Sequence, residues 1–238
     1  MRELPIRDLT EHDDNCVRRV PIFSGLTSQQ QDLVATMARP QLVSAGEVVH
    51  NPGERTGKMF IVHTGEIKLS RTLPSGRKHL LRVAHPGETL GEQAFLTGNA
   101  TLEEAEARSQ SRLCVFAHND LAKLFERYPN IAYRMLRTLG DRLAHTEHRL
   151  TLRSQSVDLR FADYLLQQPL IPAAQATEAM MRVRLPLSKK DIASLLGTTP
   201  ESLSRALARL QIKGLVAVDD DIVSLLQPDA LEELITAE

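Results

Sequence analysis

Residues 187–210 of the chain read Leu-Ser-Lys-Lys-Asp-Ile-Ala-Ser-Leu-Leu-Gly-Thr-Thr-Pro-Glu-Ser-Leu-Ser-Arg-Ala-Leu-Ala-Arg-Leu. Ser188 stands where the N-cap of a first short helix belongs, and Gly197 stands where that helix must turn. Thr199 is a second cap residue, and Pro200 after it suits the first position of a second helix. Two short, separately capped helices joined by a tight turn predict a helix-turn-helix motif.

The segments on both sides extend this motif into a predicted C-terminal domain over residues 153–238. Apolar residues at helical spacing predict a helix that begins at Val157 and ends before Pro169, and residues 181–185 predict a short strand. After the motif, residues 214–218 and 221–225 predict a β-hairpin. We therefore predict a winged helix-turn-helix domain, with residues 153–156 as the hinge before it.

The second helix of the motif has one apolar side. Leu203, Leu207 and Leu210 are spaced by four and three residues, so we expect them to be buried on one helix face. The outward residue types are those that contact DNA, because Arg bridges guanine O6 and N7, Glu accepts from cytosine, and Ser reaches a base or a phosphate. The predicted DNA contacts are Glu201, Ser202, Ser204, Arg205 and Arg209, with Ser188, Lys189 and Thr199 at the helix starts.

The charge distribution favours the same partner. The formal net charge is −1, but residues 182–213 hold seven basic and two acidic residues, a local charge of +5. Residues 214–238 hold seven acidic residues and no Lys or Arg. A basic stretch around a helix-turn-helix is typical of binding to a phosphate backbone. The alternative is that these helices pack against the rest of the chain and their charges are only solvated.

The N-terminal half has a different pattern. Residues 41–118 contain short alternating apolar runs, separated by turn signals at residues 51–53, 74–76 and 85–87. This pattern predicts a compact antiparallel sheet or barrel, and we assign residues 1–118 to a β-roll sensor domain.

Residues 119–152 form the predicted connection between these two domains. After Pro129, apolar residues recur every three or four positions, which predicts a helix of about twenty residues with a narrow apolar seam. We expect this seam to pair with a second copy of the chain, although packing against the chain's own β domain is the alternative. Its predicted residues are Ile131, Met135, Leu139, Leu143, Thr146 and Leu150.

Residues 196–215 resemble the recognition segment of CRP/FNR transcription factors, particularly the FNR side, with its Glu-x-x-Ser-Arg pattern at Glu201, Ser204 and Arg205. The order of the other parts agrees over nearly the whole chain. The resemblance implies an α+β fold with an N-terminal antiparallel β-roll of the cyclic-nucleotide-binding jelly-roll type. It implies a homodimer that binds TTGAT-like half-sites of a double-stranded DNA inverted repeat, with RNA polymerase as a further partner. It also implies control by an effector or redox event in the β-roll domain.

Residues 90–95, Leu-Gly-Glu-Gln-Ala-Phe, resemble the start of the phosphate cassette of the family's cyclic-nucleotide members. In that cassette Gly and Glu hold the ribose, and a later Arg-Ser pair binds the phosphate. The places of that pair fall near Leu102 and Glu103 here, and Arg108-Ser109 comes about six residues too late. A phosphate would meet carboxylates, so we do not expect cAMP as the effector. Gly91 and Glu92 are expected to form a turn retained by the β-roll.

The chain contains two cysteines, Cys16 and Cys114. The FNR-type [4Fe–4S] cluster takes four thiolates per subunit, so such a cluster is not expected. The two positions resemble FNR-like proteins of Gram-positive bacteria that are proposed to switch through a thiol–disulfide pair, which implies a redox role for Cys16 and Cys114. The alternative is that Cys114 is a small buried hydrophobe and Cys16 a thiol with no special role.

A further hypothesis concerns haem or a metal. His12, Asp13, Asp14 and Cys16 are ligand types suited to a metal ion or to axial coordination of haem. His12 and Cys16 are the candidate ligands of such a gas or redox sensor within the same family. The alternative is a solvated acidic tail.

Other classes of protein are disfavoured by missing signals. No stretch approaches the roughly 18 apolar residues of a membrane span, and the N-terminus has no apolar signal core, so we expect a cytoplasmic protein without a membrane partner. The sequence has no GxSxG, P-loop or HExxH motif, so we do not expect an enzyme. The remaining alternative is a β-roll ligand-binding or interaction module without DNA activity.

Overall fold

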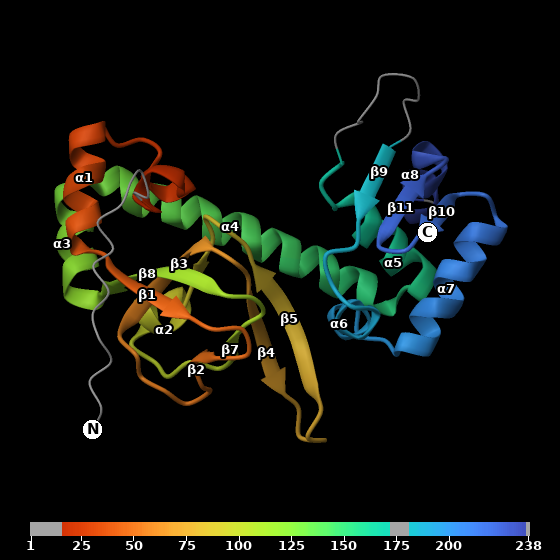
Figure 1. The fold of residues 1–238 in the computed structure, drawn as a ribbon, viewed down its shortest axis with the longest axis horizontal. Coiled ribbons are helices and arrows are strands. Elements are labelled where there is room, and N and C mark those ends of the chain that lie inside the picture. Colours follow the sequence, from red (N-terminus) through yellow and green to blue (C-terminus); the bar gives the residue numbers. More distant parts are fainter. Residues whose placement is uncertain (1–15, 172–180, 237–238) are drawn as a thin grey trace. The chain divides into compact units, whose positions relative to one another are not determined.

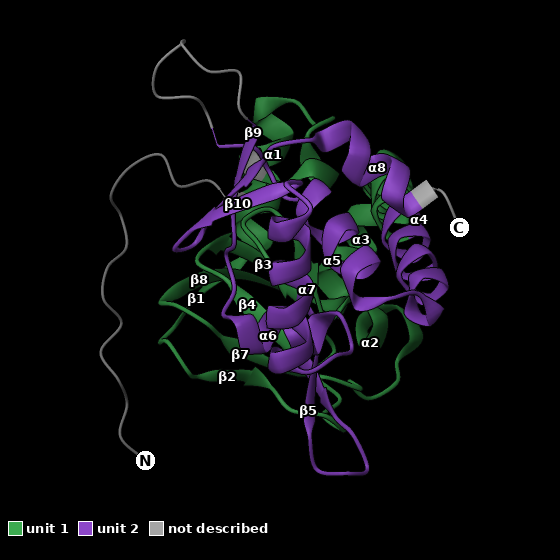
Figure 2. Ribbon diagram, turned by 90° about the vertical axis from the view of Figure 1, so that its right-hand side faces the viewer, with its two compact units in different colours: residues 1–69, 83–139 green, residues 70–82, 140–238 purple. Residues whose placement is uncertain are grey.

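The computed structural model describes residues 16–171 and 181–236, which form two compact units (Figures 1 and 2). Unit 1 comprises residues 16–69 and 83–139 of the described chain, and unit 2 comprises residues 70–82 together with the described residues from 140 onward. The predicted domain boundaries after residues 118 and 152 stay predictions. The segment 70–82 and the second half of the long helix belong to the unit that holds the helix-turn-helix.

The elements up to the long helix alternate between short helices and antiparallel strands. The helical ones are η1 (Cys16–Arg19), η2 (Pro21–Phe23), α1 (Ser28–Met37), α2 (Glu92–Thr97), α3 (His118–Arg127) and α4 (Pro129–Thr151). The strands are β1 (Arg39–Val43), β2 (Val48–His50), β3 (Lys58–Thr64), β4 (Ile67–Thr72), β5 (Lys78–Ala84), β6 (Thr89–Leu90), β7 (Glu104–Ala107) and β8 (Ser111–Ala117). They form two sheets of order β1-β8-β3-β6 and β2-β7-β4-β5, which confirms the predicted β-roll.

Alternation along β3 and β8 divides the core of unit 1 in two. Phe60 on β3 and Leu113 on β8 belong to a cluster that packs with residues of the second sheet. Their neighbours Ile61 and Cys114 belong to a second cluster, which includes residues of η1, η2, α1, α3 and α4. Successive strand residues point to opposite faces, so these two buried strands have an apolar residue at nearly every position.

A glycine is required at position 91, because the start of α2 lies close to the backbone of β3 there. Gly91 has a left-handed backbone with φ 78° at the N-cap of α2, and a Cβ on it would lie 3.0 Å from the carbonyl oxygen of Lys58. Glycine carries no Cβ and adopts this conformation without strain. The role of Gly91 as a turn residue of the β-roll agrees with the sequence-based expectation.

Helix α1 begins with a capping box. The Thr27 hydroxyl oxygen accepts a hydrogen bond from the Gln30 backbone N–H at 3.3 Å, and the Gln30 side-chain oxygen accepts from the Thr27 N–H at 2.9 Å. We expect Thr27→Ala to lower the free energy of unfolding by about 1 kcal/mol, because one N–H at the helix start loses its acceptor. Urea denaturation checks this. Thr27→Ser keeps the acceptor, so an equal loss in both variants would contradict the assignment.

The burial of residues along helix α4 shows that part of the predicted dimer seam is wrong. Ile131 and Met135 are 0% and 4% exposed and belong to the core cluster of unit 1, and Leu139 packs partly against the same cluster. The start of the helix therefore packs on the chain's own β domain, as the alternative interpretation proposed. Further along, Leu143 and Leu150 are exposed, and so are Tyr133 and Leu136, which were not predicted to lie on the seam.

Unit 2 contains the predicted winged helix-turn-helix. Its elements after α4 are η3 (Leu152–Ser154), α5 (Val157–Leu166), β9 (Met181–Arg184), α6 (Lys189–Leu195), α7 (Pro200–Ile212), β10 (Val216–Asp219), β11 (Ile222–Leu225) and α8 (Pro228–Thr236). The antiparallel sheet has the order β10-β11-β9, so the predicted hairpin is its first pair of strands. Helix α5 packs against both α7 and α8. In Figure 1 these elements run from the teal-green of α5 through the cyan of β9 and α6 to the blue of α7 and α8.

Candidate nucleic-acid interface

The helix-turn-helix is held by its two caps and one glycine. The Ser188 hydroxyl accepts from the backbone N–H of Asp191 at 3.2 Å, and the Thr199 hydroxyl accepts from the N–H of Ser202 at 3.2 Å. Between the helices Gly197 has a left-handed backbone with φ 63°, which a residue with a Cβ adopts only with strain. Ser188 and Thr199, which we predicted as DNA contacts, are thus first of all caps that set the directions of α6 and α7.

Helix α7 has a buried side and an exposed side, as its spacing predicts. Leu203, Leu207 and Leu210 are all buried, together with Ala206. The exposed residues include Glu201, Ser204 and Arg205, whereas Ser202 is half-buried. A helix whose apolar side packs on α5 and α6 presents the opposite side as a rigid surface. That surface has the width of a single helix, which the DNA major groove accommodates.

The exposed groups at the start of α7 are oriented by local contacts. Arg205 donates to the Ser202 hydroxyl at 3.1 Å, one helical turn away. A hydrogen bond from the backbone N–H of Glu201, a second from Thr199, and the charge of Arg205 lower the pKa of the Glu201 carboxyl. Glu201 is therefore ionised near neutral pH and acts only as an acceptor. A carboxylate acceptor beside a guanidinium donor can contact cytosine and guanine edges.

Arg209 differs from this group. Its guanidinium makes two hydrogen bonds to the carboxylate of Asp158 on α5, and this pairing raises the pKa of Arg209. The ion pair joins α7 to α5, so Arg209 helps to position α7, and its predicted contact with DNA stays a prediction. Asp158 was not singled out from the sequence, because the partner of a surface arginine 51 positions away leaves no local signal.

Two further arginines hold the C-terminal end of α6. Arg149 donates to the carbonyl oxygens of Leu81 and Leu195 at 2.9 and 2.7 Å, and Arg160 donates to the carbonyl oxygen of Leu196. Cations at a helix C-terminus satisfy carbonyls that have no partner within the helix. The Ser194 hydroxyl accepts from the backbone N–H of Leu80, so the segment 70–82 also contacts α6 within unit 2. Arg149 was not singled out from the sequence.

Comparisons with known proteins agree with this geometry. The cyclic nucleotide-binding domain family matches residues 40–128, and the Crp-like helix-turn-helix domain family matches residues 159–234. The nitrogen fixation regulation protein FixK of Bradyrhizobium diazoefficiens is 29% identical over 94% of this chain and 93% of its own length. The cyclic AMP receptor protein of Thermus thermophilus is 26% identical over 90% of this chain and 96% of its own length.

The chain belongs to the CRP/FNR family of transcriptional regulators. The structure of FixK2 from Bradyrhizobium japonicum covers 83% of this chain and 96% of that chain with a TM-score of 0.70 at 23% identity, so the fold is shared as well. These relatives are regulators and not enzymes. Among the described residues, no helix is long and apolar enough to cross a membrane.

The cassette of this CRP/FNR regulator does not fit a cyclic nucleotide. Glu92 is buried and Thr101 donates its hydroxyl to the carbonyl of Asn51 at 2.6 Å, so this polar group is already used within the fold. Leu102 is exposed, and the charge of Glu103 acts on His50. A cyclic phosphate is an anion and needs donors at these two places. The described residues offer it an alkyl group and a carboxylate instead.

Of the residues predicted for redox or haem sensing, the structure describes the side chain of Cys114 but not those of Cys16 and His12. Cys114 on β8 is 6% exposed and disulfide-bonded. Val17, which follows Cys16, belongs to the same core cluster as Cys114, whereas the side chain of Cys16 lies outside the described residues. His12, Asp13 and Asp14 also lie outside them. Within residues 16–171 and 181–236, no three His, Cys, Asp or Glu side chains are placed to hold a metal ion.

His50 is a buried histidine in the β-roll of this regulator. It is 1% exposed, and although the backbone of Glu103 is close enough to raise its pKa, neither ring nitrogen makes a well-formed hydrogen bond among the described residues. Burial lowers the pKa of His50, while the charges of Glu103 and Glu54 raise it by less. The folded chain therefore favours the neutral ring.

We expect this burial to make the fold less stable in acid. The unfolded chain binds a proton at His50 below about pH 6.5, whereas the folded chain binds it only at lower pH, so stability falls as the pH decreases through that window. His50→Leu removes the titrating group, and an apolar residue is tolerated where no hydrogen bond is lost. Urea unfolding at several pH values should show a shallower acid loss in the variant than in the wild type. Equal slopes would contradict this assignment.

Proposed function

We propose that this regulator binds, as a homodimer, an inverted repeat of TTGAT-like half-sites through Glu201, Ser204 and Arg205. The observation that carries the proposal is the exposed start of α7, where an ionised carboxylate, a hydroxyl and a guanidinium share the outward side of a capped helix. Lys189 is exposed at the start of α6 and suits a phosphate contact. RNA polymerase is the expected partner of the DNA-bound dimer.

Dimer formation follows from the exposed side of α4. Leu136, Leu143 and Leu150 are 66%, 58% and 57% exposed and are spaced by seven residues. A seven-residue repeat of leucine forms a continuous stripe along a helix, which is buried when two such helices wind around each other. The predicted seam is thereby revised: it keeps Leu143, Thr146 and Leu150 and gains Leu136.

Binding to a labelled duplex with two TTGAT half-sites tests the proposal. We expect at least about a thousandfold preference over the same duplex with scrambled half-sites, as is typical of specific regulators. The affinity should also fall steeply between 50 and 200 mM salt, because bound lysines and arginines release counterions from the phosphates. Equal, weak binding to both duplexes would favour the alternative of a β-roll module without specific DNA activity.

A second candidate function is redox control through Cys114. The supporting observation is its disulfide within the core of unit 1, next to the cluster that includes Ile131 and Met135 of α4. Cys16 is the only other cysteine that the sequence offers as a partner. Reduction by a dithiol would convert the disulfide into two thiols and oxidise the dithiol. Because the cluster holds the start of α4, the change could alter the dimer helices.

We expect operator affinity of the wild type to differ by about fivefold or more between oxidised and reduced protein, the range of ordinary allosteric coupling. Cys16→Ser should bind equally under both conditions, because it cannot form the bond. Fluorescence anisotropy with diamide-oxidised and phosphine-reduced protein, together with a free-thiol count, measures this. Wild-type binding that does not respond to oxidation would exclude the switch.

A further inference from the structure

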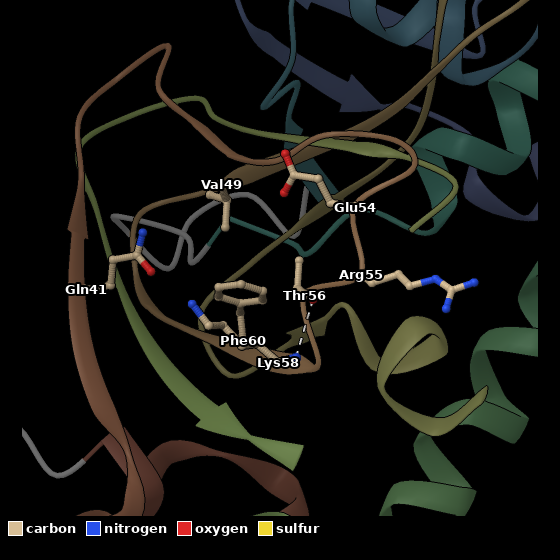
Figure 3. A pocket seen from close by; sticks show the side chains of 7 residues that line it. All are labelled: Gln41, Val49, Glu54, Arg55, Thr56, Lys58 and Phe60. Atoms are coloured by element: carbon tan, nitrogen blue, oxygen red, sulfur yellow. Dashed lines mark hydrogen bonds between the residues drawn. The ribbon is translucent and has the colours of Figure 1, made fainter. Parts of the chain in front are cut away.

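A pocket of about 450 Å³ lies in the β-roll, and the cassette does not contribute to it. It is lined from β1, β2, β3 and the connection between β2 and β3, by Gln41, Val49, Glu54, Arg55, Thr56, Lys58 and Phe60 (Figure 3). None of these residues belongs to the segment 91–106 that the family resemblance associates with a nucleotide. Its volume is within the range of small-molecule sites.

The pocket holds one charged group of each sign, Lys58 and Glu54, while the guanidinium of Arg55 points away from it. The Glu54 carboxylate accepts from the side-chain amide of Asn51 at 2.7 Å, which lowers the pKa of Glu54 and keeps it charged. Within the described part of the chain, neither the Lys58 ammonium nor the Gln41 amide has a hydrogen-bond or ion-pair partner. These two groups are thus available to a ligand.

Figure 3 shows how the side chains lie. Lys58 extends past the ring of Phe60 on the side of Gln41, whereas the guanidinium of Arg55 points away from the other lining residues. The Lys58 ammonium and the Gln41 amide therefore face the pocket, and the Glu54 carboxylate lies near its opposite side. A ligand with one negative charge matches this set, because the carboxylate would repel a doubly charged phosphate at close range.

The remaining lining is apolar and firmly held. The ring of Phe60 is 3% exposed and lies 6.1 Å, between ring centroids, from the buried ring of His50. Val49 packs beside the same core cluster. An apolar group would bury surface mainly against Val49, which is half-buried, because Phe60 keeps little exposed surface, and apolar burial contributes about 25 cal/mol per Å².

We propose that this pocket binds a small organic monocarboxylate, with its carboxylate on Lys58 and Gln41 and its apolar body against Phe60 and Val49. The unpartnered donors of Lys58 and Gln41 select this class of ligand. A carboxylate offers two acceptor oxygens in one plane, and the ammonium and amide offer donors from two sides. The proposal concerns ligand binding only, so it is independent of the operator proposed above.

Ligand-observed NMR titration of the full chain without DNA tests the site with three probes of similar size: benzoate, benzamide and benzylamine. We expect benzoate to bind at least tenfold more tightly than the neutral amide and the cationic amine. Equal binding of benzoate and benzamide, tighter binding of benzylamine, or no binding of any probe would overturn the proposal.

Variants localise the effect. Lys58→Met keeps the length of the side chain and removes the charge, so benzoate affinity should fall at least tenfold while benzamide affinity stays the same. Lys123→Met on α3 makes the same change at an exposed lysine outside the pocket and should bind benzoate like the wild type. Gln41→Ala is a second variant on the edge strand β1 and should weaken benzoate binding several-fold. Unchanged benzoate affinity in both pocket variants would refute the assignment.

Discussion

Replacing Arg205 by alanine is expected to weaken operator binding by about 30-fold to more than 10,000-fold. A guanidinium that bridges guanine O6 and N7 contributes about 1–3 kcal/mol of discrimination, and a dimer loses two such contacts. Arg205 is exposed at the start of α7, and its link to Ser202 is a single hydrogen bond at the surface, so the fold should remain intact. Binding to scrambled duplex should change much less, because phosphate contacts carry no sequence information.

Fluorescence anisotropy on the two duplexes measures both effects at one salt concentration. Arg71→Ala is the matched control, because Arg71 is an exposed arginine on β4, outside the helix-turn-helix. It removes the same charge and should leave the ratio of specific to scrambled affinity unchanged. An Arg205 variant that keeps the wild-type ratio would show that α7 does not contact bases through this residue.

Replacing Leu143 by glutamate is expected to convert the dimer into a monomer at micromolar concentration. Leu143 lies in the middle of the exposed stripe, so two copies would face each other across the seam. The variant loses the burial of two leucines, about 1.5–3 kcal/mol each, and would bury two like charges in their place. The dimer dissociation constant should rise by more than about a hundredfold.

Sedimentation equilibrium measures the change, and circular dichroism checks that the monomer stays folded. His145→Glu is the control, since His145 is exposed on the same helix and two positions further, about 200° around its axis. It should remain dimeric. A dimeric Leu143 variant with wild-type affinity would place the interface elsewhere, and the expected loss of operator affinity would then not occur either.

The elements of the DNA-binding domain were predictable because their signals are local. Ser188 and Thr199 mark helix starts by hydrogen bonds within three residues, Pro200 marks one by its fixed φ at the first helical position, and Gly197 marks a turn by its own backbone freedom. The leucine spacing on α7 likewise identifies its buried side without knowledge of what covers it. For the same reason the exposed positions of Glu201, Ser204 and Arg205 followed from the helical period alone.

The errors and omissions concern contacts between residues far apart in the chain. An apolar position on α4 packs equally well on a second copy or on its own β domain, and only the fold shows that Ile131 and Met135 are covered by the core of unit 1. Whether an arginine on an exposed helix face pairs with a carboxylate depends on what lies beside it, and only the fold shows that Asp158 lies beside Arg209.

Local hydrogen bonding, turn chemistry and hydrophobic period thus determine the elements of this protein and their order, since each depends on residues a few positions apart. The tertiary structure decides which apolar faces remain exposed, which charges are already paired, and where a cavity remains. The pocket of Lys58, Gln41 and Phe60 illustrates this: its lining lies within residues 41–60, but β1 and β3 lie near each other only because both pair with the distant strand β8. Packing of this kind depends on the whole chain and has no signature in any short stretch of sequence.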